Sequence, residues 1–520
     1  MTETTIASHI VLIHPPVVKP SEPPAGIARL SGALRSQGVE CTAIDASIEG
    51  LHHLLADSHP PPADTWSQRA RRHVHRHISA LRDPDTYRRP DTYRRAVADI
   101  GRLLSLAGKA SAVRVGLADY KDAHLSPLRS ADLIAAARRP ERNPFFEYFQ
   151  ERLIPRILAL RPAVVGISIN YLSQALCAFA LIGLIRRTGA DLKIVVGGGL
   201  ITSWMQRPER IRCLGEWVDK MIAGPGESAL LDAMGRPAAG KGWLPDYSDF
   251  LSVPYLSPGF ILPFSASDGC WWRRCAFCPE RAERRPFRPL PHRTAAEHLF
   301  RLNAQTRPVL IHLLDNAISP ALLKTLVKSP PGAPWYGFVR IGPPLDDPGF
   351  CRQLAGAGCS MLKIGLESGS QTVLDRLEKG IRLDMAAKVL DNLHAAGIAA
   401  YVYLLFGTPA EDRTAADKTL AFVAAHHPCI SFLNLAVFNL PLGSPDAEGL
   451  VLRDFYEGDL ALYSDFEHPA GWERTAVRQF LDKTFKRHPS IQPIVRNDPP
   501  VFTSNHAAFF RSSRGTGVRP

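Results

Sequence analysis

Short apolar runs alternate with stretches of helical periodicity in the first part of the chain. Buried parallel strands are predicted at residues 9–14, 39–44, 162–168 and 192–196, with a short one within 221–227. Helices are predicted at 26–37 and 176–187. Strands that alternate with helices predict a doubly wound, Rossmann-like α/β sheet, whose ligands bind at the carboxyl ends of the strands.

The same alternation returns in the second part of the chain. Six strands are predicted there, at residues 261–265, 309–314, 336–340, 361–366, 400–406 and 432–437. Helical stretches separate them, so we expect six strand–helix units. This number predicts a partial, TIM-like (β/α)6 barrel with an open side and its chemistry on the C-terminal face.

These patterns divide the chain into five parts. Residues 1–50 and 160–235 form the doubly wound domain, and residues 51–159, rich in His and Arg, are expected to be a mostly helical insertion. A Gly-, Pro- and Ser-rich linker follows at 236–258, then the barrel at 259–445. Residues 446–520 have weaker periodicity and are expected to be a small accessory region.

The composition is that of a globular protein, with 45% hydrophobic and 22% charged residues among 520. The net charge of +12 comes largely from arginines, many of them between residues 69 and 95. A basic stretch can bind nucleic acid or another acidic partner. No nucleic-acid motif with interleaved aromatic residues accompanies it, which favours a solvated helix face over a nucleic-acid site.

The cysteines indicate a reducing compartment. Six of the nine are scattered singly along the chain, which argues against a disulfide framework. The N-terminus has neither a basic segment nor a long apolar run, and no stretch reaches the length of about 18 apolar residues that a membrane helix needs. We therefore expect a cytoplasmic protein with no membrane partner.

The remaining cysteines, Cys270, Cys275 and Cys278, share one short loop with C-x4-C-x2-C spacing, and the next cysteine is Cys351. Four thiolates would suggest a closed zinc site, whereas three suit a 4Fe–4S cluster with one open iron. The alternative, three incidental buried cysteines, is disfavoured because free cysteines have no packing reason to cluster.

Polar and glycine-rich residues follow the other predicted barrel strands. They are Asp315 and Asn316, then Arg340, then Glu367 to Ser370, then Gly407 to Glu411. Because these strand ends share the C-terminal face with the cysteine loop, they are expected to converge on one site.

With these motifs the second part of the chain resembles the radical S-adenosylmethionine (SAM) enzymes. The resemblance implies that the open iron binds the SAM amino and carboxylate groups and that one electron then produces a 5′-deoxyadenosyl radical. It implies SAM contacts at the following residues: Phe277, Asp315, Asn316, Arg340, Glu367, Ser368 and Gly407. The common spacing in that family is C-x3-C-x2-C, so this loop carries one extra residue.

The first part resembles the cobalamin-binding domains that precede many radical SAM domains. Asp45, Ser47 and Gly50 keep the frame of a D-x-H-x-x-G motif, with serine in place of the cobalt-ligating histidine. The resemblance therefore implies base-off cobalamin without a histidine lower ligand. The other implied cobalamin contacts are Ser168, Gly197, Gly198 and Gly199.

Together the resemblances imply an enzyme, a cobalamin-dependent radical SAM methyltransferase acting at an unactivated carbon of an unknown small molecule or peptide. An external electron donor of the flavodoxin or ferredoxin type is also implied. Two alternatives stay open: another radical reaction, such as cyclisation or rearrangement, and a non-catalytic cobalamin or iron–sulfur sensor. Residues 143–148 and 502–507 are further candidates for substrate contacts.

Overall fold

The computed structural model describes residues 9–56, 64–237, 240, 242–455, 457–499 and 507–509. They form two compact units. The first contains the described residues up to Phe260 together with 457–461, and the second contains the rest. Within the described residues no helix is both long and apolar enough to cross a membrane.

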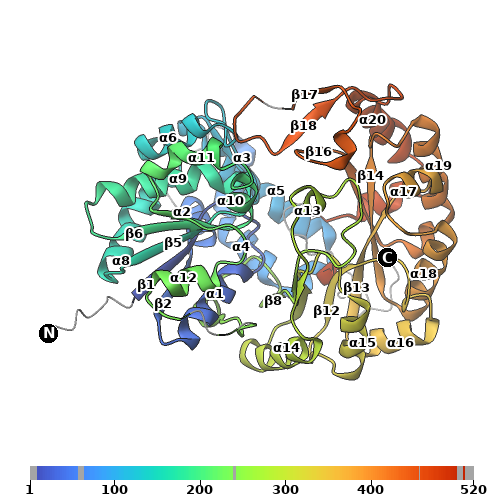
Figure 1. The fold of residues 1–520 in the computed structure, drawn as a ribbon, viewed down its shortest axis with the longest axis horizontal. Helices are drawn as coiled ribbons and strands as arrows, with labels where there is room; N and C mark the ends of the chain where they lie inside the picture. Colours follow the sequence, from blue (N-terminus) through green and yellow to red (C-terminus); the bar gives the residue numbers. More distant parts are fainter. Residues whose placement is uncertain are drawn as a thin grey trace. The chain divides into compact units, whose positions relative to one another are not determined.

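The first unit is built on a five-stranded parallel sheet with strand order β2-β1-β5-β6-β7 (Figure 1). Its strands are β1 (His9–His14), β2 (Glu40–Asp45), β5 (Val164–Ser168), β6 (Lys193–Gly197) and β7 (Lys220–Met221). Every residue of β1 and β5 is buried, as expected of strands covered on both faces. The predicted doubly wound sheet is confirmed.

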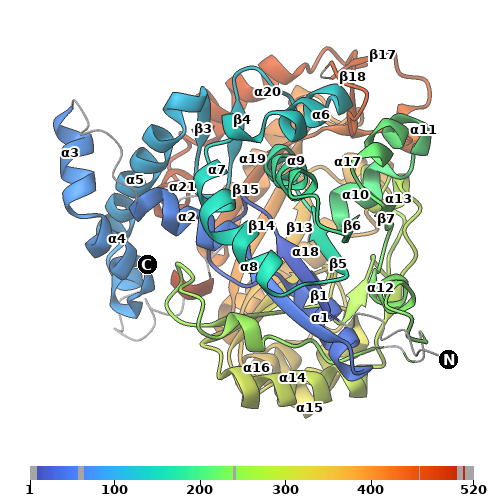
Figure 2. The ribbon, with the colours of Figure 1, turned by 90° about the vertical axis from the view of Figure 1, so that its left-hand side faces the viewer.

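Helices connect and cover these strands. They include α1 (Ala25–Ser36), α2 (Ala46–Ala56), α9 (Leu172–Arg187), α10 (Gly199–Trp204) and α12 (Glu227–Ala233). Helix α9 is buried along most of its length because α6 (Ser130–Arg138) packs against it (Figure 2). This packing explains why α9 shows an apolar run instead of an amphipathic pattern.

The insertion contains the helices α3 (Thr65–Arg72), α4 (Val74–Arg82), α5 (Pro90–Ala107), α7 (Phe146–Tyr148) and α8 (Ile154–Ala159). It also contains an antiparallel hairpin that the sequence did not predict, formed by β3 (Val113–Val115) and β4 (Tyr120–Asp122). Each strand has only three residues, too few to show an alternating pattern.

The segment expected to be a linker packs against the first unit. Arg35 forms ion pairs of 2.8 Å with Asp246 and 2.6 Å with Asp249. Asp249 also accepts a hydrogen bond from the backbone N–H of Ala43 in β2. Because β2 is an edge strand, this carboxylate pairs a backbone group that has no neighbouring strand.

The second unit contains six parallel strands in the order β15-β14-β13-β12-β11-β8 (Figure 1). They are β8 (Ile261–Phe264), β11 (Leu310–Leu313), β12 (Trp335–Val339), β13 (Cys359–Glu367), β14 (Ala399–Phe406) and β15 (Phe432–Val437). The strands lie side by side in the order in which they occur along the chain, and neighbouring strands are parallel. This is the topology of an open (β/α)6 barrel, so the predicted partial barrel is confirmed.

Helices follow the strands of this barrel in turn. They are α14 (His292–Thr306), α15 (Pro320–Lys328), α16 (Pro348–Gly356), α17 (Gln371–Arg376), α18 (Leu383–Ala396) and α19 (Arg413–Ala425). Residues from neighbouring strands, among them Ile261, Leu310, Tyr336 and Met361, form one buried layer. This layer is the core that fixes the positions of the strand ends.

After β15 the chain forms a small antiparallel sheet in the order β16-β18-β17. Its strands are β16 (Leu440–Pro441), β17 (Leu452–Asp454) and β18 (Tyr463–Phe466), and the helices α20 (Arg474–Phe480) and α21 (Gln492–Asn497) follow. The sequence showed only weak periodicity here because these strands have two to four residues each.

Candidate functional site

The three cysteines lie in a loop that a short strand pair closes. The loop leaves the barrel after β8, and β9 (Ser267–Asp268) pairs with β10 (Arg288–Pro289) on its return. Between Cys270 and Cys275 the backbone takes a left-handed turn at Arg273, with a φ of 54°. This turn accommodates the extra residue of the C-x4-C spacing.

Cys275 is buried and the other two cysteines are half-buried. Burial raises the pKa of the Cys278 thiol to about 11, and it also raises the pKa of Cys275. In the described part of the chain, no three His, Cys, Asp or Glu side chains surround a common metal position. The fit of this loop to a 4Fe–4S cluster therefore rests on its donor chemistry, three soft thiols in one segment.

The cysteine loop is bound to the turn that follows α17. The backbone N–H of Ala276 donates to the carbonyl of Leu377 at 3.0 Å, and the indole N–H of Trp272 donates to the carbonyl of Glu378 at 3.1 Å. Trp272 lies directly on Gly380, where a Cβ atom would come within 2.1 Å of the indole ring. Only glycine fits at that position, where φ is 66°.

A buried ion pair stands at the end of β13. The ammonium group of Lys379 lies 2.7 Å from the carboxylate of Glu367, which has an unusual φ of 67°. A Cβ atom at Gly365 would lie 2.5 Å from that carboxylate and 2.7 Å from the ammonium group. Gly365 therefore leaves the space that the ion pair occupies.

Lys379 also connects this strand end to the cysteine loop. Its ammonium group lies 5.5 Å from the centre of the Phe277 ring, which is a cation–π contact. Glu367 and Phe277, two predicted SAM contacts, are therefore held against the same lysine. Ser368, another predicted SAM contact, makes its hydrogen bonds within the protein. Its buried hydroxyl is hydrogen-bonded to Thr419 at 3.2 Å and accepts from the N–H of Ser370.

Arg340 reaches the cysteine loop from the end of β12. Its Nη1 atom lies 3.8 Å from the Cys275 sulfur, and its Nη2 atom donates to the carbonyl of Lys379. The guanidinium group lies 4.0 Å from the centre of the Trp272 ring. Arg340 thus places a positive charge beside one of the predicted cluster ligands.

Asp315 and Asn316 follow β11. The Asp315 carboxylate accepts from the Ser267 hydroxyl at 2.5 Å and from the N–H of Ala266 at 3.1 Å. Burial raises its pKa, and these two hydrogen bonds oppose that shift. Asp315 therefore anchors the start of the cysteine loop, whereas the Asn316 side chain is exposed.

The turn after β14 is built around Glu411. Its Oε2 atom accepts from the N–H of Gly407 at 2.5 Å and from the indole N–H of Trp472 at 3.1 Å. Burial raises the pKa of Glu411 to about 7. Trp472 comes from the region after the barrel, and no sequence pattern indicated its contact with this turn.

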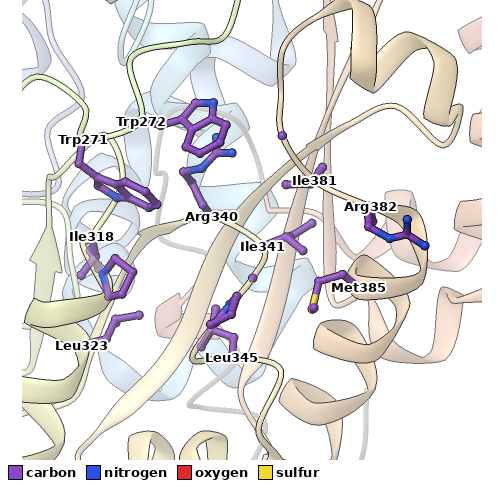
Figure 3. A pocket seen from close by; sticks show the side chains of 14 residues that line it. Trp271, Trp272, Ile318, Leu323, Arg340, Ile341, Leu345, Ile381, Arg382 and Met385 are labelled. Carbon is purple, nitrogen blue, oxygen red and sulfur yellow. The ribbon is translucent and has the colours of Figure 1, made fainter.

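A pocket of about 280 Å³ opens beside the cysteine loop (Figure 3). Trp271 and Trp272 form one wall, and Arg340 lies next to them in the same view. Gly380 lies against Trp272. The rest of the lining follows β11, β12 and α17 or belongs to α15 and α18: Ile318, Pro320, Leu323, Ile341, Gly342, Pro343, Leu345, Ile381, Arg382 and Met385.

In the first unit the Asp45 carboxylate accepts hydrogen bonds from other residues of the protein. It accepts from the Tyr255 hydroxyl at 2.9 Å and from the N–H of Ser47 at 3.1 Å, and burial raises its pKa to about 7. The Ser47 hydroxyl accepts from the N–H of Val18 at 3.0 Å. Gly50 lies inside α2, where a Cβ atom would come within 2.9 Å of the Phe145 ring.

Ser168 and the three glycines lie together at the carboxyl edge of β5 and β6. Asn170, which no sequence pattern indicated, connects them: its amide donates to the Ser168 hydroxyl at 3.1 Å, and its oxygen accepts from the N–H of Gly199 at 2.9 Å. Gly198 has a φ of 104°, and a Cβ atom there would lie 2.5 Å from the carbonyl oxygen of Ile169.

The two additional candidates for substrate contacts have different outcomes. Asn143 is buried and donates to the Tyr120 hydroxyl at 3.2 Å, and Phe145 and Tyr148 are buried as well. This segment therefore contributes to the internal packing of the first unit. Of the other segment, residues 502–506 lie outside the described part of the chain.

Comparisons with known proteins agree with this geometry. Residues 264–423 match the family model of the Radical SAM superfamily. The chain resembles solved structures of the cobalamin-dependent S-adenosylmethionine radical enzyme OxsB, with 15% identity, a TM-score of 0.60 and coverage of 98% of this chain and 71% of that one. A comparison with curated proteins finds no match.

A second similar structure is the radical S-adenosylmethionine methyltransferase TsrM from Kitasatospora setae, solved with tryptophan substrate and a SAM analogue. It has 16% identity and a TM-score of 0.57, and the alignment covers 98% of this chain and all of that one. At such identities the likeness shows the fold. The chain therefore carries a radical SAM domain within the fold of the cobalamin-dependent radical SAM enzymes.

Proposed function

We propose that this protein is a cobalamin-dependent radical SAM methyltransferase that acts on an unactivated carbon. The observation that carries the proposal is the combination of a three-cysteine loop in the radical SAM domain with a fold shared along the whole length of TsrM. TsrM is a radical S-adenosylmethionine methyltransferase, which supports methylation as the reaction.

In this proposal Cys270, Cys275 and Cys278 hold a 4Fe–4S cluster. Such a cluster, when bound, supplies one electron to SAM and offers an open iron to its amino and carboxylate groups. Asp315 fixes the start of the loop through Ser267 and Ala266. Arg340 partly neutralises the negative charge of the thiolates through its position beside Cys275.

The SAM nucleoside binds at the ends of β13 and β14. Lys379 holds the Glu367 carboxylate in one orientation, in which it can accept hydrogen bonds from ribose hydroxyl groups. Phe277 offers an aromatic face near the adenine, and Gly407 permits a close approach of the backbone. The N–H of Gly407 is held by Glu411, so the turn is formed before the cofactor arrives.

Cobalamin binds in this proposal at the carboxyl edge of the first unit's sheet. The glycines at 197–199 and the Ser168–Asn170 pair line that edge without bulky side chains. Bound cobalamin supplies a carrier for the methyl group. A serine hydroxyl is a poor cobalt ligand, and that of Ser47 accepts a hydrogen bond from the N–H of Val18, so we propose base-off cobalamin without a histidine lower ligand.

The test is a product assay on anaerobically reconstituted, reduced protein with SAM and hydroxocobalamin. Methyl transfer predicts that S-adenosylhomocysteine is formed together with 5′-deoxyadenosine. If 5′-deoxyadenosine is formed without S-adenosylhomocysteine, the alternative of a cyclisation or rearrangement replaces the proposal. If SAM is not cleaved at all, a sensor role does.

A further inference from the structure

Strand β13 carries a lysine on the face that points into the barrel. Met361 on this face belongs to the buried layer that joins neighbouring strands, and side chains on one face of a strand recur every second residue. Lys363 and Gly365 therefore follow on the same face, and a Cβ atom at Gly365 would lie 2.5 Å from the Glu367 carboxylate. Lys363 is only 5% exposed. At a rise of about 3.3 Å per residue, it lies about 13 Å along the strand from Glu367, deeper in the barrel.

The Lys363 ammonium group lies among an imidazole and two aromatic rings. Its Nζ atom is 3.1 Å from Nε2 of His312, and because an ammonium group can only donate, His312 accepts there and carries its proton on Nδ1. The ring centres of Tyr336 and Phe338 each lie 5.0 Å from Nζ. The His312 ring stacks on Tyr336 with centres 4.4 Å apart. With His312 neutral, the ammonium group is the one charge among these four side chains.

Half-buried side chains line the barrel interior beside Lys363. Phe338 is in register with Lys363, and its ring centre lies 4.8 Å from that of Tyr403. Tyr403 and Asn434 are in register with Gly365, the next inward position of β13, which has no side chain of its own. Phe338, Tyr403 and Asn434 all keep accessible surface. A ligand can therefore contact two aromatic rings and an amide while one of its ends reaches Lys363.

We propose that Lys363 binds a carboxylate of the substrate and that Phe338 and Tyr403 contact its apolar part, so that the substrate is a small carboxylic acid with an apolar, ring-containing body. The proposal rests on the function proposed above and names the substrate class of the same site. One ammonium group matches one carboxylate, whereas a phosphate group carries up to two charges and calls for several donors. With its carboxylate at Lys363, such an acid extends along β13 toward Glu367, where SAM is proposed to bind.

The experiment compares the binding of phenylacetate with that of its neutral amide, phenylacetamide. Both are measured by equilibrium dialysis against the full, cluster-loaded chain in the presence of SAM. The test variant is Lys363→Met, which removes the charge and nearly keeps the length of the side chain, and Lys363→Gln serves in its place if Lys363→Met does not load the cluster. The control is Lys388→Met on α18, at an exposed position of the same unit. Iron content and the unfolding temperature report whether each variant is folded.

We expect the wild type to bind phenylacetate at least about tenfold more tightly than phenylacetamide, because a hydrogen bond to a charged group is lost with the amide. The test variant should lose this preference, and the control should keep it. Equal affinity for the two compounds in the wild type, or binding of neither, overturns the proposal without any variant. A preference that survives the loss of the Lys363 charge overturns it as well. If the wild type fails to cleave SAM with dithionite, the function proposed above fails instead.

Discussion

The carboxyl group of Glu411 gives a prediction that needs no cofactor. The side chain is 1% exposed, and two N–H groups donate to its Oε2 atom. Among the described residues its Oε1 atom has no hydrogen-bond partner. Burial raises the pKa from its ordinary value of 4.5 to about 7, because the charged form is poorly solvated.

The sign of the pH dependence follows from this shift. The folded protein binds the Glu411 proton more tightly than the unfolded chain does, so this contribution to stability is complete below about pH 4.5 and is lost as pH rises to about 7. One pKa unit corresponds to about 1.4 kcal/mol, so the raised pKa corresponds to a loss of about 3 kcal/mol across that interval.

The assay is urea unfolding followed by tryptophan fluorescence at about pH 5 and about pH 8. The glutamine side chain of the Glu411→Gln variant cannot ionise. As pH rises from about 5 to about 8, we expect the free energy of unfolding to fall by about 2 to 3 kcal/mol less in this variant than in the wild type. Glu297→Gln, at an exposed position on α14, is the matched control and should follow the wild type. Equal pH dependence in the wild type and Glu411→Gln would show that the pKa of Glu411 is not raised by its burial in the folded protein.

Three further predictions concern the barrel face. Lys379→Met leaves the Glu367 carboxylate buried without its cation and should cost about 3 to 5 kcal/mol in thermal unfolding, much of it recovered by adding Glu367→Gln. Gly365→Ala places a Cβ atom in the space of the same ion pair and should weaken SAM binding at least about tenfold in equilibrium dialysis, and unchanged binding would contradict the role given to the pair at the ribose. Arg340→Gln removes a positive charge beside Cys275 and should shift the cluster potential to more negative values in a redox titration, and an unchanged potential would contradict the role given to Arg340.

The strands of both sheets were predictable because their sequences are nearly continuous apolar runs. Residues 9–14 and 432–437 were predicted with the bounds that the structure shows for β1 and β15. The run at 9–14 is followed by Pro15 and Pro16, and the run at 432–437 is preceded by Ser431, residues that favour turns over a buried strand. The cysteine loop was recognisable for a similar reason, since its spacing is a local property of the sequence.

The contacts that organise the site were not predictable in the same way. Trp472 reaches Glu411 across 61 residues, and Arg340 reaches Cys275 across 65. Such pairs depend on how strands and loops are brought together, and no local periodicity carries that information. The close packing of Gly50 against Phe145 was not predictable either, because it is visible only in the folded structure.

The most direct test of the central claim is 5′-deoxyadenosine formation by the full chain after anaerobic reconstitution with iron and sulfide and reduction with dithionite. We expect an iron–sulfur absorbance and SAM cleavage in the wild type, and loss of both when Cys270, Cys275 and Cys278 are replaced by alanine. If the wild type forms no cluster, or if the triple variant still cleaves SAM, the three-cysteine loop is not the reactive centre and the account is contradicted.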